Sequence, residues 1–247
     1  MQKKLLASFV GIILSFTTVF ATVDDRKKDS YFNFSSTDLK FNIAVGMNSG
    51  DGFEPYRFMM QPYFQIDNKY LQAYAGIQAA NEMWHATAGA VAWPLRWNRI
   101  RLGAGLIYHF NYFEDISLCH DLMLNIHFET RPAYWLGIKL NTGYFHKARK
   151  IFAVEDYVGY IENNSVDFSL ETDFYLPYNI TMYTRVSSYE LFRYMVFCAP
   201  SFTFGVSKSL GKRVDLTFET TTRYIDFFTV SARYDDSEMR FVMGFHL

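Results

Sequence analysis

Cysteine is scarce in this sequence, and no cysteine pair has the spacing of a metal site. The two cysteines, Cys119 and Cys198, fall on stretches expected to face opposite ways, so we expect two free thiols and no disulfide framework. There is no glycine-rich phosphate loop. The formal net charge is -1, which argues against a nucleic-acid partner, because nucleic-acid-binding proteins carry a basic face.

Long apolar runs are also scarce, and the longest, residues 5–20, lies near the N-terminus behind two lysines. Ala21 supplies a small residue before a cleavage point, so we predict that residues 1–21 are a cleaved signal peptide. An uncleaved anchor helix is the alternative, but roughly sixteen residues is short for a span of about twenty. No later stretch could span as a helix, so a mature protein in lipid would have to be a β-barrel. The polar residues 22–38 are expected to form a periplasmic N-terminal segment.

Aromatic residues are abundant, with 25 Phe, 18 Tyr and 4 Trp making 19% of the 247 residues. The mean hydropathy is only -0.06. Many aromatics at average hydropathy fit an antiparallel barrel in lipid, where only alternate residues need be apolar. They also fit an aromatic-rich soluble β-sandwich.

The last ten residues show the alternation most clearly. One set is entirely apolar: Met239, Phe241, Met243, Phe245 and Leu247. The other set is mostly polar or small. A period of two predicts a strand with two different faces, and a barrel-closing strand in a membrane needs this pattern.

The same alternation recurs along the chain and predicts about twelve strands. The expected ranges are 39–47, 55–66, 69–80, 82–96, 100–113, 117–130, 134–146, 165–176, 180–189, 194–208, 214–224 and 238–247. The alanine-rich range 82–96 could form a helix, but its Gly, Thr and Pro residues favour a strand. An even number of strands puts both termini on one side. The tight turns then fall on that side, and the longest connections, 147–164 and 226–237, fall on the other.

Aromatic residues gather near the expected strand ends, which predicts two girdles at the membrane interfaces. The turn-side set is Tyr63, Tyr70, Trp93, Trp97, Tyr134, Trp135, Tyr175 and Tyr178. The loop-side set is Phe110, Tyr112, Phe113, Tyr144, Phe145, Tyr189, Phe192, Phe227 and Phe228.

The inward set of a barrel with this register carries charges of both signs. We expect the lumen to be lined by Arg57, Arg101, Asp121, His127, Glu129, Lys139, Asp167, Glu171, Asp173, Arg185, Asp215, Glu219, Arg223, Glu238 and Arg240. Opposed charges should pair across strands. They would form either a structural ion-pair network or a pore wall that sets selectivity. Twelve tilted strands give a backbone diameter of roughly 24 Å, which long side chains would narrow to a fine pore or block.

The best titratable cluster for catalysis is His127 with Asn125, Glu129 and Asp121 on one strand. It lacks a serine nucleophile, and one strand carrying these residues is weak evidence for a metal. We therefore expect no enzyme activity, no cofactor and no metal.

Residues 39–247 resemble the small outer-membrane β-barrel proteins, porin-like, of diderm bacteria. The resemblance is carried by the signal segment, the alternating strands and the terminal apolar set that includes Phe245. Terminal strands of that family usually end in Phe and are read by the barrel-assembly machinery, whereas this sequence ends in Leu247. The resemblance implies Sec-type export to the outer membrane, with membrane lipids and the assembly machinery as partners.

These features predict a closed antiparallel barrel that forms a narrow channel for small polar solutes. One alternative is a plugged, adhesin-type barrel whose outer loops, especially 147–164, bind ligands. The other is a soluble secreted β-sandwich.

Overall fold

The computed structural model describes residues 37–48, 57–80, 83–113, 117–152, 159–188, 201–224 and 234–247. The predicted signal peptide and nearly all of the segment 22–38 lie outside the described residues, as does Cys198. Asp38, the last residue of that segment, already belongs to the first strand.

The described residues form twelve strands and one short 3-10 turn, η1 (Pro177–Asn179). The strands are β1 (Asp38–Asn48), β2 (Arg57–Asp67), β3 (Leu71–Ala80), β4 (Met83–Arg96), β5 (Ile100–Phe113), β6 (Ser117–Ala133), β7 (Leu136–Ile151), β8 (Gly159–Leu176), β9 (Ile180–Ser187), β10 (Ser201–Leu210), β11 (Val214–Tyr224) and β12 (Tyr234–His246). No helix among these residues is long and apolar enough to cross a membrane.

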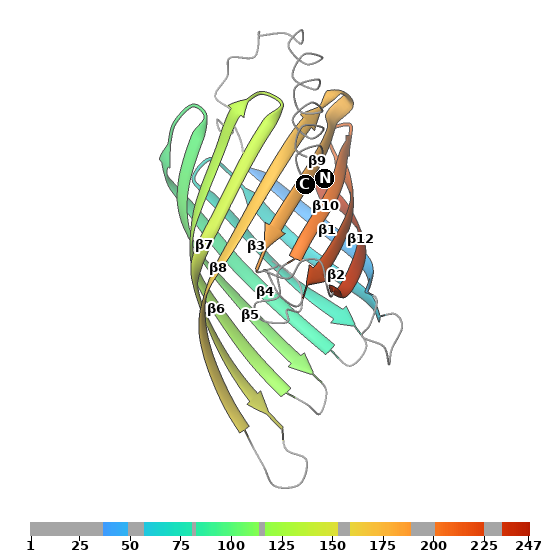
Figure 1. Cartoon of the computed structure of the whole chain (residues 1–247). Coiled ribbons are helices and arrows are strands. Elements are labelled where there is room, and N and C mark those ends of the chain that lie inside the picture. Colours follow the sequence, from blue (N-terminus) through green and yellow to red (C-terminus); the bar gives the residue numbers. More distant parts are fainter. Residues whose placement is uncertain are drawn as a thin grey trace, which may run out of the picture.

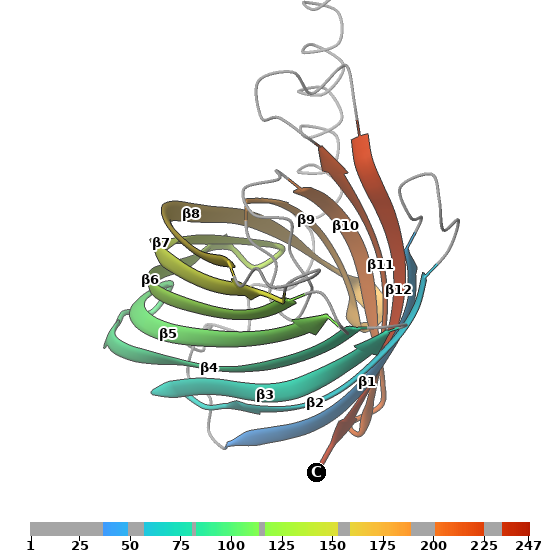
Figure 2. The same ribbon diagram turned by 90° about the horizontal axis from the view of Figure 1, so that it is seen from below.

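The twelve strands close into one antiparallel barrel (Figure 1). Each strand pairs with its neighbours in the sequence, and β1 pairs with β12 to complete the ring (Figure 2). Phe41 lies opposite Phe245 and Ile43 opposite Met243, so the last strand pairs with the first as the sequence predicts. A closed sheet has no edge strand. The barrel prediction is therefore confirmed, and the β-sandwich alternative is wrong.

The outer face of the barrel is apolar. Phe58, Phe64, Leu124 and Met239 are each more than half exposed, and the residues between them are mostly buried. Soluble monomers rarely expose continuous apolar surface on this scale, whereas a barrel in lipid requires it.

The alanine-rich fourth range is a strand, as predicted, and it pairs along most of its length with both β3 and β5. Gly89 in β4 lies opposite Tyr74 in β3. A Cβ at Gly89 would lie 2.5 Å from the Tyr74 ring. The glycine therefore lets the aromatic ring lie flat across β4 on the inside of the barrel.

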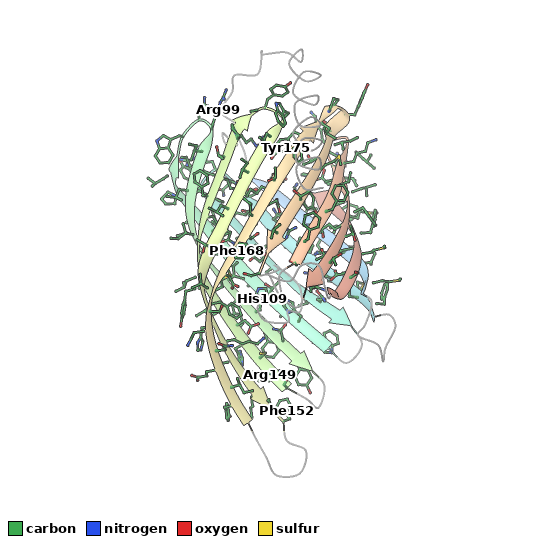
Figure 3. The ribbon with its side chains drawn as sticks, in the orientation of Figure 1. Arg99, His109, Arg149, Phe152, Phe168 and Tyr175 are labelled. Atoms are coloured by element: carbon green, nitrogen blue, oxygen red, sulfur yellow. The ribbon has the colours of Figure 1, made fainter. Side chains whose placement is uncertain are left out.

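The predicted long connection 147–164 is wrong, because most of it is strand. β7 and β8 have 16 and 18 residues and stay paired out to Ile151 and Gly159. A membrane strand needs only about 9 to 11 residues. The extra length forms a ribbon past the other strand ends, opposite the tight turns (Figure 1). Arg149 and Phe152 lie at its tip, far from Arg99 and Tyr175 at the turn end (Figure 3). A strand outside the lipid does not need an apolar side chain at every second position. The alternating sequence pattern therefore ends before the strand ends.

The second predicted long connection, 226–237, is also shorter than expected, because β12 begins at Tyr234.

Four of the predicted girdle residues point inward. Trp93 and Phe145 are 1% and 2% exposed, and Tyr63 and Tyr175 line internal cavities. Each of the four alternates in phase with the inward residues of its strand. This phase, and not the position near a strand end, decides that the side chain points into the barrel. Tyr70, Trp97, Tyr134 and Tyr178 are exposed on the turn side, as a girdle requires.

Candidate functional site in the barrel lumen

Five charged side chains of alternating sign lie directly opposite one another on five successive strands, β5 to β9. Their order is Arg101, Glu129, Lys139, Glu171 and Arg185. Arg101 Nη2 lies 2.7 Å from Glu129, Lys139 Nζ 2.6 Å from Glu171, and Arg185 Nε 3.0 Å from Glu171. Opposite charges placed across neighbouring strands attract, and the confined lumen strengthens that attraction.

The row continues on the far wall through Glu219 and Arg240, which are register partners on β11 and β12. Glu219 lies 3.6 Å from Arg185 and 3.7 Å from Arg240. Tyr183 donates its hydroxyl to Glu219 by crossing over Gly205 on the strand between them. A Cβ at Gly205 would lie 2.1 Å from the Tyr183 ring, so this position must be glycine for the contact to form. We call the seven charged residues from Arg101 to Arg240 the charge belt.

Two cavities adjoin the belt on the side of the tight turns. The first has a volume of about 420 Å³ and the second about 470 Å³, and both are lined by Gln65, Lys139, Glu171, Asp173, Tyr175 and Arg185. The charged lining of the first is Asp67, Glu129, Glu171, Asp173, Arg101, Arg131, Lys139 and Arg185. The charged lining of the second is Glu171, Asp173, Asp215, Glu219, Lys40, Lys139, Arg185 and Arg240. Each wall therefore holds four carboxylates and four cations.

Aromatic rings lie against two of the arginine residues that line the first cavity. The Arg101 guanidinium lies 3.9 Å from the centre of the Trp93 ring, and His127 meets that ring edge-on at 5.9 Å. The Arg131 guanidinium lies 4.2 Å from the centre of the Tyr175 ring. Such stacking holds a guanidinium flat against the aromatic ring.

The opposite half of the lumen is packed more tightly on the β3 to β7 side. Ile107, Met123 and Phe145 form a buried apolar cluster, with Tyr74 against it. The alternation of polar and apolar residues predicts a polar inner face, so it did not predict an apolar cluster inside the barrel. The positions of these four residues could have revealed it, because all four alternate in phase with the inward residues of their strands.

Beyond the apolar cluster, a buried chain of hydrogen bonds joins β4, β5 and β6. His109 Nδ1 lies 3.1 Å from His85 Nε2, and His85 Nδ1 contacts the Asn111 amide oxygen. Asn111 in turn donates to Asp121 at 3.1 Å. Both histidines are 2% exposed. The Cys119 thiol also contacts Asp121. No group of three metal ligands occurs within the ranges that the structure describes.

Ion pairs also join strands at the two ends of the lumen. Arg223 Nη2 lies 3.0 Å from Glu238, and both residues are buried. A hydrogen bond from the Ser188 hydroxyl to Asp167, at 3.1 Å, adds a link between strands at the same end. At the turn end, Lys40 Nζ lies 3.0 Å from Asp215.

The structure thus places fourteen of the fifteen residues expected in the lumen on the inner side of the strands. The side chain of Arg57, the first residue of β2, lies outside the described part. Seven of the fourteen join the charge belt, and His127, Asp173 and Asp215 line the cavities that adjoin it. Asp121, Asp167, Arg223 and Glu238 lie apart, in the other half. The cluster expected around His127 does not form one unit, because Asp121 bonds to Asn111 and Glu129 to Arg101.

Other lumen residues were not in the expected set: Lys40, Asp67, His85, His109, Asn141 and Tyr183. All have inward parity, which is the signal that could have found them.

The barrel is similar in fold to solved outer-membrane channels. NanC porin aligns with a TM-score of 0.59 at 13% identity, covering 84% of this chain and 98% of its own. KdgM porin in complex with disordered oligogalacturonate aligns at 0.57 and 8% identity, covering 84% and 99%. An outer-membrane channel from Pseudomonas putida F1 aligns at 0.53 and 8% identity, covering 91% and 100%. No protein-family model and no curated protein sequence matches the chain. The chain therefore has the fold of the porin-like outer-membrane barrels.

Proposed function

We propose that this protein is an outer-membrane barrel that forms a narrow channel for small polar solutes. The observation that carries the proposal is the pair of adjoining cavities inside the closed barrel, about 420 and 470 Å³, with charged and polar walls. Such a wall can replace part of the hydration shell of a polar solute. The fold similarity to KdgM, NanC and the Pseudomonas channel supports a transport role.

The proposal includes the route to the membrane. Residues 1–21 would direct Sec-type export, and β12 would be read by the barrel-assembly machinery before insertion among outer-membrane lipids. The apolar outer face and the ring closed by β1 and β12 support this location. The proposal assigns no catalytic step and no cofactor to the chain.

Liposome swelling tests the channel directly. Folded full-length protein reconstituted in liposomes should admit small neutral sugars quickly and larger ones progressively more slowly, because the belt narrows the lumen. Equal rates for all sizes would contradict a narrow channel, and no swelling at all would contradict a channel of any width.

A plugged barrel is the second candidate, and the tight packing on the β3 to β7 wall favours it. Ile107, Met123, Phe145 and His85 are only 1–2% exposed. In that case the ligand-binding part would be the β7–β8 ribbon and not a long loop. A plugged barrel would bind a ligand at the ribbon without any solute flux.

A further inference from the structure

We propose that the first cavity binds small zwitterions, such as short peptides with free termini. This inference rests on the proposed channel function and names the class of solute that the same lumen would take.

The charge balance of the wall is the first reason. Four carboxylates and four cations line the cavity, and along β5 to β9 their signs alternate from strand to strand. Neighbouring strands lie about 4.8 Å apart. A dipeptide holds its ammonium and carboxylate groups within about 7 Å of each other. A zwitterion can thus meet both signs at once, whereas a polyanion would face as many carboxylates as cations.

Three polar atoms without partners are the second reason. Asp67 Oδ1, His127 Nε2 and Asn141 Oδ1 are buried on the wall of this cavity and have no hydrogen-bond partner among the described residues. A buried polar atom left unpaired is costly, so a ligand that satisfies it is favoured. Asp67 suits an ammonium group. His127 and Asn141 are register partners on β6 and β7, placed to meet a peptide amide.

Arg131 provides for the other end of the solute. Its guanidinium is stacked on Tyr175, and both residues line the same cavity. The positive charge of Arg131 attracts a carboxylate, in addition to the contacts that Arg131 already makes within the protein. The cavity therefore combines an acidic anchor, an amide-binding pair and a basic anchor.

Three matched probes test the inference on the folded, detergent-solubilised full chain: alanyl-alanine, its N-acetyl derivative and its C-terminal amide. They share a dipeptide backbone and differ in their terminal groups, which make them a zwitterion, an anion and a cation. Saturation-transfer NMR and titration calorimetry should show the zwitterion binding at least roughly tenfold more tightly than either of the others. Equal binding of all three, tighter binding of the anion or cation, or no binding would overturn the inference.

Asp67→Asn removes one charge at nearly constant shape. The substitution should weaken the binding of alanyl-alanine by roughly tenfold to a hundredfold. It should leave the binding of the N-acetyl derivative unchanged, because that probe lacks the ammonium group. Glu162→Gln, on the exposed outer face of β8, removes a carboxylate away from the lumen and should change neither. Heat-modifiable gel migration would show that both variants fold. Equal weakening of both probes by Asp67→Asn would overturn the assignment of Asp67 as the ammonium anchor.

Conductance of the same preparations separates this inference from the proposed function. A conducting barrel that binds no dipeptide would refute the inference and leave the channel standing. A dipeptide-binding barrel without conductance would refute the channel and leave the binding site standing.

Discussion

His246 bridges two carboxylates from other strands at the seam of the barrel. Its Nε2 lies 2.8 Å from Asp215 on β11, and its Nδ1 lies 2.9 Å from Asp38 on β1. Lys40 lies 3.0 Å from the same Asp215. The penultimate residue of the chain therefore links β12 to both of its neighbours through its side chain.

Replacing His246 should weaken this seam without preventing assembly. His246→Ala leaves the ladder between β1 and β12 intact and removes two partly buried hydrogen bonds, so the free energy of unfolding should fall by about 1–3 kcal/mol. Urea unfolding followed by gel migration would measure it. His246→Gln, which can keep one of the two bonds, should lie between the variant and the wild type. An unchanged midpoint for His246→Ala would show that the contact is not stabilising.

Phe245→Asp should block assembly. Phe245 lies opposite Phe41 on β1 and Val214 on β11, on the apolar face of the last strand. A carboxylate there would have to enter the membrane beside apolar partners, which is unfavourable. Outer-membrane fractionation in a diderm host should show the variant missing while His246→Ala is present. Normal levels of the Phe245→Asp variant would count against the membrane orientation of β12.

Glu171→Gln should disrupt the charge belt. Glu171 is the shared partner of Lys139 and Arg185, so its neutralisation leaves two cations in the lumen with less compensation. Breaking a buried ion pair costs about 3–5 kcal/mol, and the partial exposure of Lys139 reduces this to about 1–3 kcal/mol. The reversal potential in a salt gradient should also shift toward anion selectivity. The exposed Glu162→Gln should change stability by no more than about 0.5 kcal/mol and leave the selectivity unchanged.

Gly205→Ala should displace Tyr183 from its bond to Glu219. The added methyl group would overlap the tyrosine ring, and overpacking of this kind costs about 1–3 kcal/mol. The effect should be strongly non-additive with Tyr183→Ala, because removing the ring removes the clash. Urea midpoints of the two single variants and the double variant would form the cycle. Additive losses would show that the ring does not lie over Gly205 in solution.

Much of this architecture could be predicted from the sequence because lipid imposes a rule on alternate residues. The apolar set from Met239 to Leu247 identified the closing strand, and inward parity found the members of the charge belt. The rule ends where the lipid ends. The strand extensions to Ile151 and Gly159 carry no alternation of apolar residues. Backbone pairing holds them together with side-chain contacts such as that of Arg149 with Ser117.

The alternation of residues also does not predict which inward side chains contact one another. Asp67, His127 and Asn141 line one cavity because β2 faces β6 and β7 across the lumen, which depends on how the barrel closes. Trp93 and Phe145 were expected at the membrane interfaces because aromatics are common there, yet both fill the interior. An aromatic side chain is stable both at a membrane interface and in the barrel interior, so the residue type alone does not predict which way it points.

Conductance of the purified, folded protein in planar lipid bilayers tests the central claim most directly. A narrow channel predicts discrete current steps of uniform size after each insertion. The ion selectivity of these currents should shift toward anions in Glu171→Gln and stay unchanged in Glu162→Gln. Repeated insertions of heat-modifiable, folded barrel that carry no current would contradict the channel.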